Sequence, residues 1–147
     1  MRRAILLALA FGCGGDLTEL VVVIESDLAI PSELQRIDLV VTGPDGSTVV
    51  DQTLDFTLPG APMPPLTLGL VQEGEAGPVV AEAIGMTATG GVISRSMSTS
   101  FVDGEIRTLS LPLQSSCIDV PCGAGMTCNA GTCESHEVPG DSLPSFP

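Results

Sequence analysis

The chain has 147 residues, an apolar fraction of 44% and a formal net charge of −13, with 18 acidic side chains against five Lys and Arg. This length accommodates one ordinary domain with small appendages. The scarcity of cations excludes a patch that neutralises a row of phosphates, so we expect no nucleic-acid binding. Trp and Tyr are absent and Phe occurs four times, which predicts an aliphatic core.

Residues 1–12 have the composition of an export signal. Arg2 and Arg3 follow the initiating Met1, and an apolar run occupies residues 4–11. A basic start followed by a short apolar run is typical of a signal peptide. The run is far shorter than the roughly 20 residues that a membrane-spanning helix needs.

The segment LAFGC at residues 9–13 resembles the lipobox of bacterial lipoproteins. The resemblance implies lipidation of Cys13, a lipidated linker over 13–17, and attachment to the membrane by the lipid anchor. Gly14, in place of Asp, implies the outer membrane of a Gram-negative cell. Lipidation also explains a cysteine that lies far from the other four. An ordinary secretory signal, which yields a secreted protein, is the alternative.

Residues 18–113 predict an all-β domain, a seven-stranded antiparallel sandwich. Short runs rich in Val, Ile, Leu and Thr are separated by Gly, Pro and Asp at intervals typical of such sandwiches. The pattern leaves open whether the strand order is immunoglobulin-like or transthyretin-like. The expected runs are 20–24, 37–42, 47–57, 66–70, 79–86, 92–101 and 106–113.

Two connections within this domain are strongly marked. The sequence GPDG at residues 43–46 predicts a hairpin turn, because Pro fixes one φ and Gly tolerates a positive one. The prolines of residues 58–65, LPGAPMPP, predict a rigid connection between the sheets. Between these connections, Asp51 and Asp55 alternate with apolar residues and are expected on the solvent face of a strand.

Four cysteines lie within residues 117–133 and predict a small disulfide-rich module over residues 114–134. A segment this short has no core of its own, and in an oxidising compartment two disulfides replace one. Spacing alone permits three connectivities, and a zinc site of four thiolates is an alternative that the export signal disfavours.

The arrangement CGAGMTCNAGTC resembles the C-terminal half of modules similar to epidermal growth factor. This resemblance implies that Cys117 pairs with Cys128 and that Cys122 pairs with Cys133. The whole chain resembles bacterial envelope lipoproteins in which a β domain precedes such a motif. Most members of that group have no assigned activity.

Candidate catalytic residues lack the partners that catalysis needs. His136 lies in residues 135–147, which their polar, proline-bearing composition predicts to be a disordered tail, so we expect no general base. We expect neither an enzyme nor a cofactor. Four serines at period 2 are expected on the wet face of a strand without catalytic function: Ser94, Ser96, Ser98 and Ser100.

The function that the sequence favours is that of a non-enzymatic envelope lipoprotein, a binding or adhesion-type module at the cell surface or in the periplasm. Its partner would be an envelope or extracellular protein, bound through loops or an exposed strand edge. The first alternative is a structural spacer without a ligand. The second is a calcium-binding module, which rests on acidic residues at expected turns: Glu73, Glu75, Asp103 and Glu105.

Overall fold

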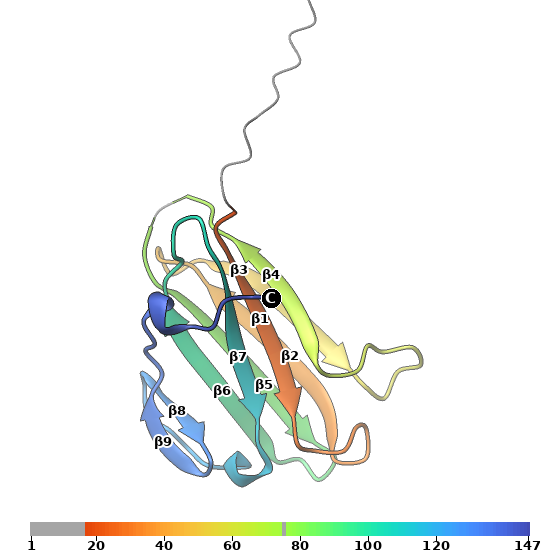
Figure 1. Ribbon diagram of the computed structural model, residues 1–147. Coiled ribbons are helices and arrows are strands. Elements are labelled where there is room, and N and C mark those ends of the chain that lie inside the picture. Colours follow the sequence, from red (N-terminus) through yellow and green to blue (C-terminus); the bar gives the residue numbers. More distant parts are fainter. Residues whose placement is uncertain (1–16, 75) are drawn as a thin grey trace, which may run out of the picture.

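The structure, a computed structural model, describes residues 17–74 and 76–147. Cys13 and the expected signal peptide lie outside the described residues. Two sheets pack face to face (Figure 1), which confirms the predicted all-β sandwich. One sheet has the order β4-β1-β7, formed by Leu66–Val71, Glu19–Ser26 and Ile106–Leu113. The other has the order β3-β2-β5-β6, formed by Thr48–Asp55, Leu34–Thr42, Val79–Thr87 and Val92–Thr99.

The strand order excludes one of the two arrangements that the sequence left open. In the immunoglobulin order the first two strands share a sheet. Here β1 and β2 lie in different sheets, so the immunoglobulin-like expectation is wrong, and the transthyretin-like one stays a prediction.

One strand pair also departs from the expected antiparallel arrangement. β1 and β7 pair in parallel, from Glu19 opposite Ile106 to Ser26 opposite Leu113. Parallel neighbours need a long connection. The first and last strands of the sandwich meet this condition because the other five strands lie between them in sequence.

The core forms because alternate residues of each strand point between the sheets. In β7, Leu109, Leu111 and Leu113 are fully buried while Ser110 is exposed. Burial of one such leucine contributes roughly 1.5–3 kcal/mol. Facing them from the other sheet are the inward residues of β2, including Ile37.

The cysteine-rich segment packs into one side of this sandwich. It consists of the 3-10 turn η1 (Ser115–Cys117) and the hairpin of β8 (Met126–Asn129) and β9 (Thr132–Ser135), which lies beside β6 (Figure 1). Disulfides join Cys117 to Cys128 and Cys122 to Cys133, the pairing that the resemblance implied. Cys117 and Cys128 are each 3% exposed and belong to the main core.

Residues 135–147, expected to be a disordered tail, instead bind along two strand edges. The N–H of Ser98 on β6 donates to the carbonyl of His136 at 2.8 Å, and the N–H of Thr108 on β7 donates to that of Pro144, also at 2.8 Å. Beyond the 3-10 turn η2 (Gly140–Ser142), Leu143 enters the core. The composition predicted disorder because it does not reveal that sheet edges offer this segment backbone partners.

The two disulfides offer a matched comparison, because both join residues separated by 11 positions. Equal loops imply similar entropic contributions, about 3 kcal/mol each. We expect replacement of Cys117 and Cys128 by serine to cost about 2 kcal/mol more than replacement of Cys122 and Cys133, since only the first change places hydroxyls in the core. Urea unfolding followed by circular dichroism measures both free energies. Equal losses would show that the first disulfide acts only as a crosslink.

Candidate functional site

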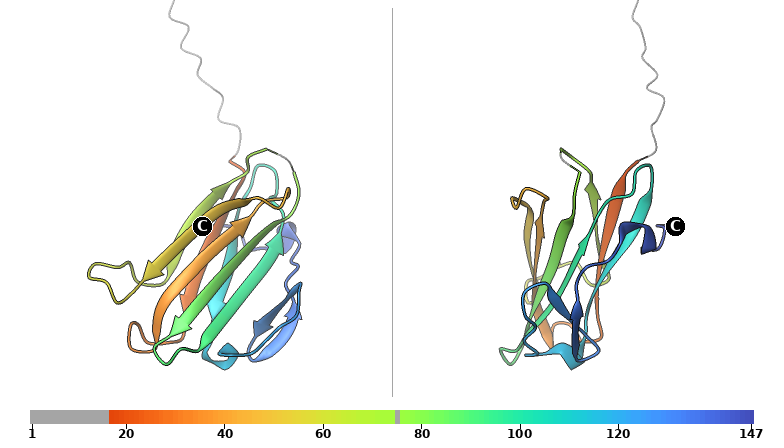
Figure 2. Two further views of the ribbon diagram at one scale, coloured as in Figure 1. Left: turned by 180° about the vertical axis from the view of Figure 1, so that it is seen from behind. Right: turned by 90° about the vertical axis from the view of Figure 1, so that its left-hand side faces the viewer.

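The two long sides of the sandwich differ: seen from behind in Figure 2 (left), β8 and β9 lie along one side only. On the covered side, residues 114–147 lie against β6 and β7. On the open side, β3 and β4 are the outermost strands of their sheets. Each side has cavities.

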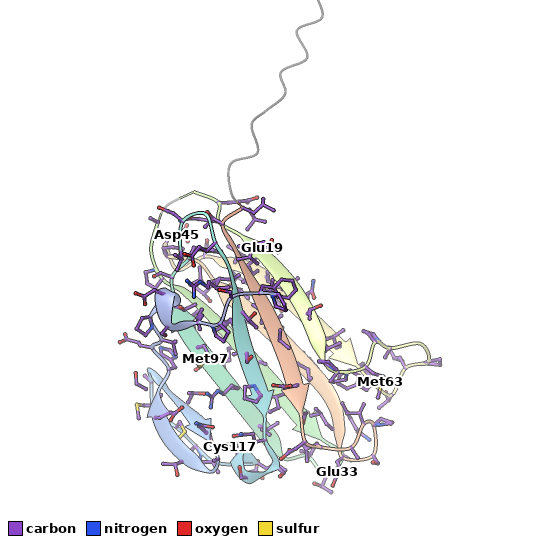
Figure 3. All side chains as sticks on the ribbon, in the orientation of Figure 1. Glu19, Glu33, Asp45, Met63, Met97 and Cys117 are labelled. Carbon is purple, nitrogen blue, oxygen red and sulfur yellow. A yellow bond between two sulfur atoms is a disulfide. The ribbon has the colours of Figure 1, made fainter. Side chains whose placement is uncertain are left out.

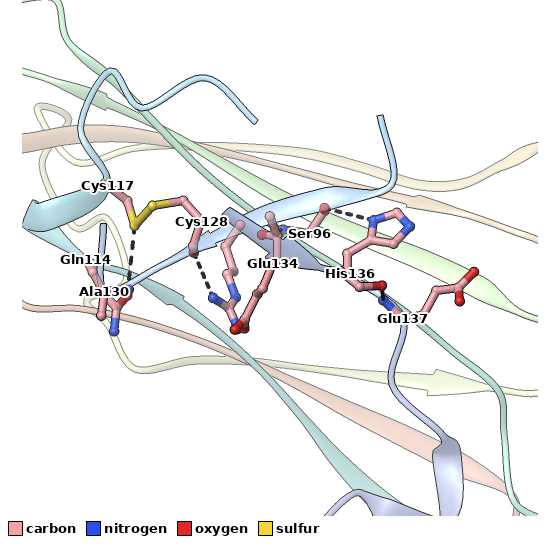
Figure 4. Close-up of polar contacts among 11 residues, drawn as sticks. Ser96, Gln114, Cys117, Cys128, Ala130, Glu134, His136 and Glu137 are labelled. Carbon is pink, nitrogen blue, oxygen red and sulfur yellow. Dashed lines mark hydrogen bonds and ion pairs between the residues drawn. A yellow bond between two sulfur atoms is a disulfide. The ribbon is translucent and has the colours of Figure 1, made fainter. Parts of the chain in front are cut away.

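On the covered side, the chain brings a serine and the histidine together (Figure 4). Oγ of Ser96 lies 3.0 Å from Nδ1 of His136, and the N–H of Ser96 donates to Oγ1 of Thr127 at 2.9 Å. Ser96 is 9% exposed, so its expected place on a solvent face is wrong. The period of β6 gives no signal of this burial, because the covering segment comes from far along the chain.

Ser96 and His136 line a cavity of about 400 Å³ between the outer face of β5–β6 and the cysteine-rich segment. Glu82 also lines it, and its Oε1 accepts a hydrogen bond from Oγ of Ser94 at 3.3 Å. A hydroxyl within reach of an imidazole is the first requirement of nucleophilic catalysis, and a group that orients the imidazole is the second. Among the described residues, no side chain is hydrogen-bonded to Nε2 of His136.

The contacts of His136 indicate attachment of the tail to β6. Its N–H donates to the carbonyl of Gly125 at 3.0 Å, its carbonyl accepts from Ser98, and its ring binds Ser96. Two of these bonds hold His136 against β6, and the third joins it to the loop that precedes β8. We therefore assign a structural role to the Ser96–His136 contact: it helps to pack residues 136–138 against β6.

Arg95 of β6 also attaches the cysteine-rich segment to the sandwich. Its Nη1 donates to the carbonyl of Cys128 at 2.7 Å, and its Nη2 lies 3.7 Å from the carboxylate of Glu134. Burial lowers the pKa of Arg95, and the charge of Glu134 opposes that shift. The guanidinium thus joins the sheet interior to β8 and β9.

The acidic residues considered for calcium do not form a site in the described parts of the chain. Glu105 is paired with Arg107, and Glu75 lies outside the described residues. Within residues 17–74 and 76–147, no three His, Cys, Asp or Glu side chains gather where they could hold a metal ion.

On the open side, two cavities of about 360 and 340 Å³ lie between the sheets. The first is next to the proline-rich connection, where Met63 is 56% exposed and projects away from Cys117 and the covered side (Figure 3). The second is next to the 43–46 turn, where Val49 and Val71 are 58% and 57% exposed.

The inward-facing residues of β3 and β4 border both cavities. Leu54 and Gln52 of β3 border the first cavity and Val50 borders the second. On β4, Leu66 and Leu68 border the first and Leu70 the second. The open side is therefore a slot lined mainly by apolar residues, with Gln52, Thr67 and Glu73 as its polar positions. The sequence does not predict this slot, because a strand pattern does not show which sheet edges stay uncovered.

Comparisons with protein-family models, with curated proteins and with solved structures found no match. In the described parts of the chain, no helix has the length and apolar character needed to span a bilayer.

The Ser96–His136 contact makes a measurable contribution if it holds the tail in place. We expect Ser96→Ala and His136→Ala each to lower the free energy of unfolding by about 1 kcal/mol. The double variant should lose less than the sum, because both changes remove one bond. Ser116→Ala, at an exposed position, is the control. Hydrolysis of an activated ester that disappears in both single variants would overturn the packing assignment.

Proposed function

We propose that the chain is a non-enzymatic envelope lipoprotein, held at the membrane by a lipid on Cys13, that binds another envelope or extracellular protein. The observation that carries the binding role is the open side. Two cavities lined mainly by apolar residues lie between β3 and β4, whose outer edges pair with no other strand among residues 17–74 and 76–147, and the exposed apolar residues Val49, Met63 and Val71 surround them.

The structural contrast between the two sides supports this role over that of a spacer. A spacer gains nothing from exposed apolar surface or unpaired strand edges, both of which favour aggregation. On the covered side, β6 and β7 are shielded by residues 114–147. We infer that the open side is left uncovered for a partner.

The anchor is supported by the lipobox resemblance at residues 9–13 and by the pairing of the four other cysteines with one another. An acylated cysteine carries more than one hydrocarbon chain, which is what stable attachment requires. The outer membrane of a Gram-negative bacterium is the location that this signal favours.

The anchor predicts a defined mass for the mature protein. Membrane-associated protein should begin at Cys13, carry an acyl-glyceryl group, and release four thiols only after reduction. Cys13→Ala should abolish the added mass and the membrane association. An unmodified N-terminus in the wild-type protein would contradict the anchor and favour the secreted alternative.

The binding role predicts that covalent capture depends on the side of the sandwich. A photo-reactive amino acid in place of Met63 should form an adduct of discrete mass in intact cells. The same substitution at Met126, a partly exposed methionine on the covered side, is the matched control. Adducts from neither position, or equally from both, would refute binding at the open side and favour the spacer.

A further inference from the structure

The cavities of the open side are spaced for alternate side chains of an added strand. Val50 and Leu54 of β3 border different cavities and are four residues apart, which corresponds to about 13 Å in a strand. Gln52 points inward between them. A strand added to β3 would place apolar residues opposite Val50 and Leu54 and a polar residue opposite Gln52.

The outer faces of the two outermost strands indicate that β3 is the edge that receives this strand. The outward residues Asp51 and Asp55 give β3 two carboxylates. The outward residues of β4 carry no charge: Thr67, Gly69 and Val71. In an added strand, the position opposite Asp51 lies directly across from a carboxylate, and the position opposite Thr53 lies diagonally between Asp51 and Asp55. Long cationic side chains reach directly opposed and diagonal neighbours, so the outer face of β3 selects cations at these two positions of its partner.

Neither aspartate of β3 forms an ion pair within the described parts of the chain. Asp51 is exposed, and among the described residues it has no side-chain hydrogen bond or ion pair. Hydrogen bonds from the hydroxyl and the N–H of Thr57 hold the pKa of Asp55 below its usual value. A cation from the partner therefore meets the exposed Asp51 carboxylate directly, whereas Asp55 lies opposite Arg36 of β2.

A second copy of this chain lacks the cations that the site selects. Arg36, Arg95 and Arg107 are the arginines of the described residues, and each is paired with a carboxylate of its own chain. The net charge of −13 also opposes self-association. The complementary occupant is a basic segment of a different protein.

We propose that β3 receives an extended segment of a partner protein with the pattern apolar, basic, polar, basic, apolar, whose two apolar side chains fill the two cavities of the open side. This proposal rests on the binding role of the open side and names its partner by chemistry. The pattern reads the same in both directions, so it fits a parallel or an antiparallel addition.

The test uses purified full-length protein and short synthetic peptides centred on Val-Lys-Thr-Lys-Val. Val-Glu-Thr-Glu-Val replaces the cations, and Ser-Lys-Thr-Lys-Ser removes the apolar anchors. Asp51→Lys reverses the charge on β3. Asp103→Lys makes the same change in net charge at an exposed turn. Calorimetry gives the affinities, and hydrogen exchange locates the protected amides.

We expect the Lys peptide to bind more tightly than both others and to slow exchange in residues 48–55 without affecting β8 and β9. Asp51→Lys should weaken the Lys peptide roughly two- to fivefold, the effect of one cross-strand charge pair, and strengthen the Glu peptide. Asp103→Lys should change neither affinity by that amount.

Equal affinities for the Lys and Glu peptides, equal effects of Asp51→Lys and Asp103→Lys, or protection outside β3 would overturn this assignment. So would self-association of the chain that protects β3 without peptide. These failures leave the binding role untouched where Met63 still yields an adduct and Met126 does not. Loss of the Met63 adduct refutes the binding role itself.

Discussion

The fold depends on residues 114–147, which cover the outer edge of β6. Val92 donates its N–H to the carboxylate of Asp119 and accepts from the N–H of the same residue, at 2.8 and 2.7 Å. Further along, Ser96 donates to the hydroxyl of Thr127 and Ser98 to the carbonyl of His136. Backbone groups at an edge otherwise remain open to pairing with other chains. The covering segment has no core of its own, and the buried Cys117–Cys128 disulfide joins it to the core of the sandwich.

The segment that covers this edge shares one hydrophobic core with the strands, although the sequence suggested separate regions. Cys117, Cys128 and Leu143 belong to the same core cluster as the strands, although the sequence suggested a domain that ends at residue 113. Residues 114–147 are therefore structural elements of the sandwich. The sandwich in turn buries the cysteines and leaves the open side as the region where both sheets end without cover.

What could be predicted from the sequence follows from local patterns. Alternation placed Leu109, Leu111 and Leu113 inside and Asp51 outside, and the proline-rich connection correctly marked a change of sheet. The parallel β1–β7 pair, the ordered tail and the burial of Ser96 depend on contacts between distant segments, which no local period encodes. The disulfide pairing came from a resemblance to other modules, because spacing alone allows three solutions. The apolar slot was not predictable for the same reason: it is defined by the absence of a covering strand.

The acidity of the chain counteracts self-association at its open side. An exposed apolar slot beside unpaired strands promotes association between copies, and charge on the edge strand is a usual defence. Asp51 and Asp55 put such charge on β3, and the net charge of −13 adds long-range repulsion between identical chains. The same carboxylates attract a cationic segment. Repulsion between copies and attraction of the proposed basic partner therefore need no separate features. Both arise from the acidic residues on the outer face of β3, whose inner face is mainly apolar.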